Sequence, residues 1–114
     1  MDKALERFLK YVQIDTQSDE NSPTSPSAMK ELNLSREILK DLEELGIHGE
    51  IDEYGRLYAH LPGEEGSDPI GLNSHVDTAL EISGANVKPR IVKNYDGGVI
   101  KLNERYSMSP DQFP

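Results

Sequence analysis

The sequence contains no cysteine, so disulfides and thiolate metal sites are excluded, and nothing indicates an oxidising compartment. It also lacks long apolar runs, since none exceeds three residues, as at Leu57–Ala59. A membrane-spanning helix needs about 20 consecutive apolar residues, and a signal peptide needs an apolar core of its own. We therefore expect neither segment, and we expect a cytoplasmic protein.

Large aromatic and basic residues are scarce. There are two Phe and no Trp among 114 residues, and apolar residues make up 35%, which predicts one domain with a thin core. Twelve basic side chains face 21 acidic ones, giving a formal net charge of −9. Such a surface repels phosphate groups, so nucleic acid and anionic membranes are not expected as partners.

Two amphipathic helices are predicted in the first 46 residues. Apolar residues recur at helical spacing over 2–13, and Asp2 can accept a hydrogen bond as the N-cap. A polar loop over 18–26 follows. Ser25 before Pro26 predicts the start of a second helix, and Gly46 predicts its left-handed end after Leu45.

Strand patterns follow the second helix. Apolar and polar residues alternate over 47–52 and 56–61, on either side of a Tyr54–Gly55 turn, which predicts a hairpin. A third short strand is predicted over 70–75, after a loop over 62–69. Two further strands, over 87–92 and 99–102, are placed around the turn at 96–98. Residues 103–114 have no periodicity, and we expect them to be poorly ordered.

One constellation carries chemistry: His75 and Asp77, two residues apart where the third strand meets a loop. In an extended chain both side chains project to one side. A zinc-ligating histidine usually donates its second ring N–H to a carboxylate or carbonyl, which fixes its tautomer. The pair can therefore supply a metal ligand and its orienting group. As a bare pattern it is weak, because this spacing often arises by chance, and an ordinary solvated His–Asp pair is the default interpretation.

The residues around the pair resemble the first metal motif of the di-zinc exopeptidases, a superfamily that includes aminoacylase, carboxypeptidase G and the peptidase T family, which matches best. The motif itself is Ser74-His75-Val76-Asp77-Thr78. Other stretches resemble the same family in the same order, so that nearly the whole chain is covered: 9–18, 39–47, 83–100, 108–110 and 113–114. Asn73 departs from the pattern, which usually has an apolar residue there.

The resemblance implies an α/β fold: residues 1–114 would form the N-terminal portion of a three-layer αβα catalytic domain, with two helices and then a mixed sheet. It implies a zinc-dependent aminopeptidase that releases the N-terminal residue of tripeptides, with two zinc ions in the intact enzyme. His75 would be a zinc ligand, and Asp77 would hold its imidazole. The other ligands and the glutamate general base would lie outside this chain, so we expect an inactive fragment that binds little zinc and self-associates.

Two alternatives remain: a truncated, non-catalytic relative that serves as a binding or structural module, and an independent acidic domain whose His–Asp spacing is accidental. Other candidate ligands fit worse. His48 and His60 fall on polar strand faces, and the acidic loop 64–68 lacks the order of a calcium loop. Asp15 and Thr16 are interpreted as a turn. No Ser/His/Asp set or phosphate loop is present.

Overall fold

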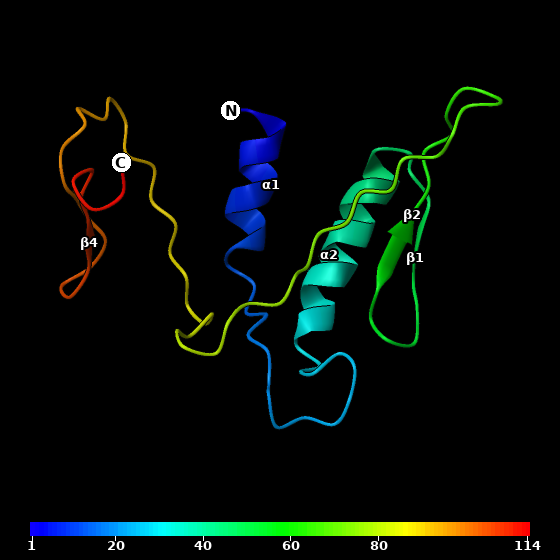
Figure 1. Ribbon diagram of the computed structural model, residues 1–114, viewed down its shortest axis with the longest axis horizontal. Coiled ribbons are helices and arrows are strands. Elements are labelled where there is room, and N and C mark those ends of the chain that lie inside the picture. The colour runs from blue at the N-terminus through cyan, green and yellow to red at the C-terminus, as the bar shows by residue number, and fades with distance from the viewer.

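Two helices and two short hairpins make up the regular structure. A computed structural model describes all of residues 1–114 (Figure 1). The elements are, in order, α1 (Lys3–Tyr11), α2 (Glu31–Glu44), β1 (Gly49–Ile51), β2 (Leu57–Ala59), β3 (Ile100–Lys101) and β4 (Ser107–Met108). The Cα radius of gyration is 17.7 Å, whereas a compact domain of 100 residues has about 13 Å. The chain is therefore open, and neither helix has the length and apolar character that a membrane crossing requires.

The start of α1 is as predicted. Asp2 has extended backbone angles, and its carboxylate accepts the Ala4 N–H at 3.0 Å, which satisfies one of the unpaired donors of the first turn. The helix ends at Tyr11, two residues before the predicted limit.

The predicted start of α2 at Ser25 is wrong, because the helix begins at Glu31. The Glu31 carboxylate accepts the Ser27 hydroxyl at 2.7 Å and the Ala28 N–H at 2.9 Å. These bonds hold residues 27–30 in turns that precede the helix. The end is as predicted: Gly46 has a φ of 76°, and the Ile47 N–H bonds to the Leu42 carbonyl at 2.9 Å, which is a Schellman motif.

The first hairpin is confirmed, with β1 and β2 antiparallel and Ile51 opposite Leu57. The Asp52 carboxylate holds its turn by accepting the backbone N–H groups of Tyr54 and Arg56, each at 2.9 Å. Gly49 is buried, and a Cβ there would lie 2.9 Å from Leu39 Cδ1 of α2. The absence of a side chain at this position lets α2 pack closely on β1.

The strands predicted over 70–75 and 87–92 are wrong. Residues 70–77 run without a ladder partner, and the single bridge nearby joins Gln17 to Thr78 in parallel. A strand needs a neighbour to take its backbone hydrogen bonds, and residues 70–75 make no backbone hydrogen bond to another segment. Residues 100–101 do form a strand, β3, but its antiparallel partner is β4, which lies within the segment 103–114.

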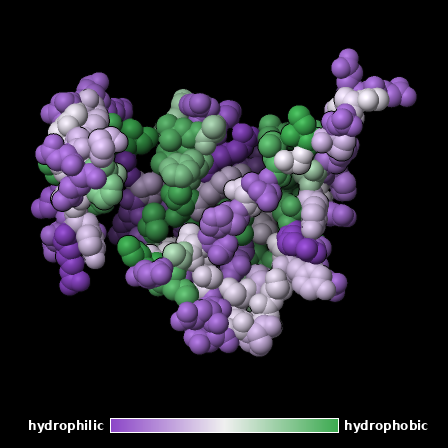
Figure 2. All heavy atoms as spheres, viewed as in Figure 1, coloured by the Kyte–Doolittle hydropathy of each residue, from purple (hydrophilic) through white to green (hydrophobic).

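The sheet is therefore not the mixed one predicted. Two separate two-stranded antiparallel pairs are present, which is α/β in character. Leu34 on α2 is the one buried apolar side chain. The apolar face of α1 is not covered as its amphipathic pattern predicts, since Phe8 is 60% exposed, and Figure 2 shows hydrophobic atoms gathered on the surface over α1. The thin core expected from composition is thus thinner still.

Candidate functional site

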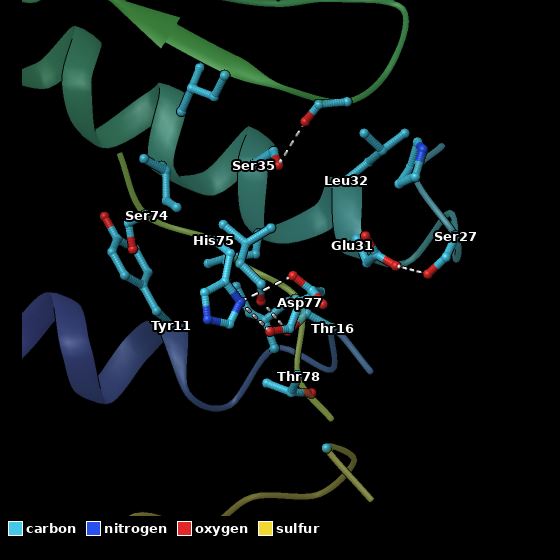
Figure 3. Close-up of a pocket in the computed structure, with 18 of the residues that line it drawn as sticks. Tyr11, Thr16, Ser27, Glu31, Leu32, Ser35, Ser74, His75, Asp77 and Thr78 are labelled. Atoms are coloured by element: carbon cyan, nitrogen blue, oxygen red, sulfur yellow. Dashed lines mark hydrogen bonds and ion pairs between the residues drawn. The ribbon is translucent and has the colours of Figure 1, made fainter. Parts of the chain in front are cut away.

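His75 and Asp77 face each other at the surface of an open cleft (Figure 3). The His75 Nδ1 atom lies 3.1 Å from the Asp77 Oδ1 atom and 3.0 Å from the Asp77 carbonyl oxygen. Both oxygens are acceptors when the carboxyl group is ionised, so Nδ1 carries the proton. In a neutral imidazole the Nε2 lone pair is then free, which is the arrangement of a metal-binding histidine with its orienting carboxylate.

The cleft lies between the two helices and the segment that carries the pair. Apolar side chains of α1, α2 and residues 72–87 line it, among them Phe8, Leu34, Leu72 and Ile82. The His75 side chain is 83% exposed, and that of Asp77 is 48% exposed. One side of the pair is therefore exposed to solvent, and the His75 Nε2 atom is accessible.

A short tract before α2 holds the backbone of the pair. Thr16 donates its hydroxyl to the Val76 carbonyl at 2.7 Å and accepts the Thr78 N–H at 3.0 Å. The neighbouring residue, Asp15, is held by its own contacts. A 2.9 Å ion pair with Lys30 and a hydrogen bond from the Gln17 N–H hold the pKa of the Asp15 carboxyl below its ordinary value.

No group of three or more His, Asp or Glu side chains in the chain is arranged to hold a metal ion. The buried carboxylates are already engaged: Asp41 with Lys10 at 2.6 Å and Glu31 with Ser27. Catalytic zinc takes three protein ligands. Of three such ligands this chain offers one candidate, His75, and no set of three is formed.

The other sequence candidates lie apart from the cleft. His48 and His60 are exposed, as expected for solvated side chains, and the loop with Glu64, Glu65 and Asp68 is exposed as well. Sequence reasoning assigned Thr16 to a turn and missed its contact with Val76. Sixty residues separate the two positions, and no local pattern indicates a pairing over that distance.

Comparisons with known proteins give one consistent result. The whole chain is 47% identical to peptidase T of Clostridium acetobutylicum, of which it covers 29%. It is 48% identical to peptidase T of a Geobacillus species over 96% of the chain and 28% of that relative. For peptidase T of Bacillus subtilis the identity is 43%, over 99% of the chain and 29% of the relative. No family model matches. The resemblance drawn from the motifs is confirmed, and the chain spans less than a third of the length of these relatives.

Proposed function

We propose that this chain, similar over its whole length to the peptidases T, forms part of the catalytic domain of a zinc-dependent aminopeptidase that releases the N-terminal residue of tripeptides. The observation that carries the proposal is the His75–Asp77 pair, whose Nδ1–carboxylate contact leaves Nε2 free. It lies in the segment that resembles the first metal motif of the di-zinc exopeptidases. The cytoplasmic location expected from the sequence belongs to the same proposal.

His75 is the proposed zinc ligand, through Nε2. Asp77 is not a ligand: its carboxylate accepts a hydrogen bond from the Nδ1–H group, which holds the ring plane and makes the imidazole more basic. Bound zinc would supply a polarised substrate carbonyl and a water acidic enough to act as a nucleophile. The part of this chain in that chemistry is to hold one imidazole in the correct tautomer and orientation at the rim of a cleft.

The chain alone is proposed to be inactive. Hydrolysis by this chemistry needs two metal ions and a general base around one water molecule. In this chain His75 is the one metal ligand that the motif resemblance supports. The remaining ligands and the base would come from outside the 114 residues. Exposed apolar residues such as Ile70 and Leu72, 88% and 95% accessible, would meanwhile favour self-association of the isolated chain.

A free-standing binding module is the alternative function, and the packing argues against it. A module that folds alone needs a core of its own, whereas Leu34 is the one buried apolar side chain. The extended segment 70–75 leaves its backbone without ladder partners. Both features are typical of a segment that packs within a larger domain.

The test is a chimaera in which this chain replaces the aligned segment of the Clostridium acetobutylicum peptidase T. We expect the chimaera to hydrolyse a tripeptide in the presence of zinc, and His75→Ala to abolish this activity. His60→Ala is the matched control, because His60 is exposed and lies outside the cleft, and it should leave the activity unchanged. A fully active His75→Ala chimaera would refute the proposal.

A further inference from the structure

Thr16 is buried, with 2% of its surface accessible. It lies between α1 and α2, in a chain of mostly exposed side chains. A buried hydroxyl must find a hydrogen-bond partner, because burial without one costs free energy. Thr16 finds its partner 60 residues away, in the carbonyl oxygen of Val76, at 2.7 Å.

The tract 16–18 makes all the hydrogen bonds that join residues 60–114 to residues 1–59. Besides the Thr16–Val76 bond, the Thr78 N–H donates to the Thr16 carbonyl at 3.0 Å, and the Ser18 N–H donates to the Thr78 carbonyl at 3.1 Å. Gln17 Nε2 also donates to the Leu80 carbonyl at 3.0 Å. We call the Thr16–Val76 and Thr16–Thr78 bonds the Thr16 clamp.

The clamp holds the residues on both sides of Asp77. Val76 is fixed through its carbonyl and Thr78 through its N–H, so the backbone of Asp77 between them has little freedom. Asp77 then presents its carboxylate and its own carbonyl to the same atom, His75 Nδ1. Figure 3 shows Thr16 and Thr78 beside Asp77, with the His75 ring on its other side.

We infer that Thr16 is a positioning residue for the His75–Asp77 pair: its hydroxyl fixes the backbone that carries Asp77, and through it the tautomer and direction of the His75 ring. Its importance for catalysis rests on the proposed function. The link from Thr16 to the His75 tautomer does not, because it can be measured in the metal-free chimaera, with the His75 ring signal assigned by its loss in His75→Ala.

Long-range ¹⁵N–¹H NMR correlations of the histidine rings, recorded near pH 8.5 where an ordinary histidine with a pKa of about 6.5 is neutral, report which nitrogen carries the proton. In the wild-type chimaera we expect His75 to be protonated mainly at Nδ1. Thr16→Val keeps the shape but removes the hydroxyl, and should move His75 to the tautomer ratio of a free peptide spanning residues 74–78. Thr16→Ser should keep the wild-type ratio.

Thr78→Val is the matched control, because the Thr78 side-chain hydroxyl makes no hydrogen bond, and it should leave the ratio unchanged. Asp77→Asn should change it. A wild-type ratio in Thr16→Val beside a changed ratio in Asp77→Asn overturns the role of Thr16 and leaves the pair intact. No change in either variant overturns both the role of Thr16 and that of Asp77. Loss of the α2 resonances in Thr16→Val would mean that this variant is unfolded, and the test then uses Thr16→Ser. If Thr16→Ser is folded and His75 still has the tautomer ratio of the free peptide, the inference is overturned.

The activities of the same variants separate this inference from the proposed function. Loss of the group that orients a metal ligand typically costs about 10- to 100-fold in activity or metal affinity. Thr16→Val should lower kcat by that order, with KM little changed, and Thr16→Ser should restore it. An unchanged kcat in Thr16→Val overturns the role of Thr16 even if His75→Ala is inactive. An active His75→Ala chimaera refutes the proposed function instead.

Discussion

Lys10 on α1 and Asp41 on α2 form a two-pronged ion pair, with the Lys10 Nζ atom 2.6 Å and 2.7 Å from the two carboxylate oxygens. Asp41 is buried, with 6% of its surface accessible. It also accepts the Tyr11 hydroxyl, and the Arg7 Nε atom lies 3.7 Å away. The polar side of α1, rather than its apolar side, therefore attaches this helix to α2.

We predict that Asp41→Asn detaches α1 from α2. The amide keeps the size of the side chain but removes the charge that Lys10 and Arg7 face, and hydrogen bonds to charged groups contribute about 1.5–3 kcal/mol. Amide hydrogen exchange over Lys3–Tyr11 should accelerate by roughly ten- to a hundredfold. Glu44→Gln changes an exposed acid in the same helix without an ion pair and should have no such effect. Equal exchange in both variants would show that other contacts hold α1.

The same cluster predicts a loss of stability at alkaline pH. Desolvation and the hydrogen bond to Asp41 raise the pKa of Tyr11 to about 12, above its unfolded value of about 10. Because the pKa of Tyr11 is higher in the folded state, this residue contributes to the free energy of unfolding. The contribution is complete below pH about 10 and is lost as pH rises through about 12. The absorbance of tyrosinate should therefore show one of the five tyrosines titrating late. Tyr11→Phe should remove that late step, and its persistence would contradict the assignment.

Two glycines should respond differently to alanine. At Gly49 a Cβ would meet Leu39 Cδ1 at 2.9 Å and the Tyr58 carbonyl at 3.1 Å, so Gly49→Ala should force β1 away from α2 at a cost of about 1–3 kcal/mol. At Gly46 a Cβ meets nothing within 4 Å, and the φ of 76° alone is unfavourable, by about 1–2 kcal/mol. Nuclear Overhauser contacts between the methyl groups of Leu39 and Leu57, whose Cδ1 atoms lie 2.9 Å and 3.5 Å from the Cβ position at Gly49, should weaken in Gly49→Ala and persist in Gly46→Ala. The reverse pattern would contradict the packing.

Metal binding by the isolated chain should be weak. His75 is the one candidate ligand and no group of three is formed, whereas catalytic zinc takes three protein ligands. Isothermal titration with zinc should show no stoichiometric binding, and His75→Ala should change the weak signal little. Tight one-to-one binding that is lost in His75→Ala would mean that further residues of this chain complete a site.

The sequence predicts the parts of the structure that local chemistry determines. The Asp2 cap, the Gly46 end of α2 and the Tyr54–Gly55 turn depend on residues within a few positions of one another, and all three are found. The start of α2 differs from the prediction because the Glu31 carboxylate accepts hydrogen bonds from the Ser27 hydroxyl and the Ala28 N–H. These bonds stabilise turns where the Ser25–Pro26 pattern predicts the first turn of the helix.

The features that the sequence does not predict correctly depend on partners distant in sequence. The segment 70–75 has the composition of a strand, but a strand forms only beside another one, and periodicity does not say whether that neighbour is present. The His75–Asp77 contact was expected from spacing and is found. The Thr16 clamp beneath it joins positions 60 residues apart, which one sequence does not reveal.

The most direct test of the proposed function is the zinc content of the purified chimaera and its variants, measured by mass spectrometry after removal of loose metal. We predict about two zinc ions in the chimaera, the number that the di-zinc exopeptidase resemblance implies. His75→Ala should lose at least one of them, and His60→Ala should lose none. Full zinc content and full tripeptide hydrolysis in the His75→Ala chimaera would contradict the assignment of His75 as a metal ligand.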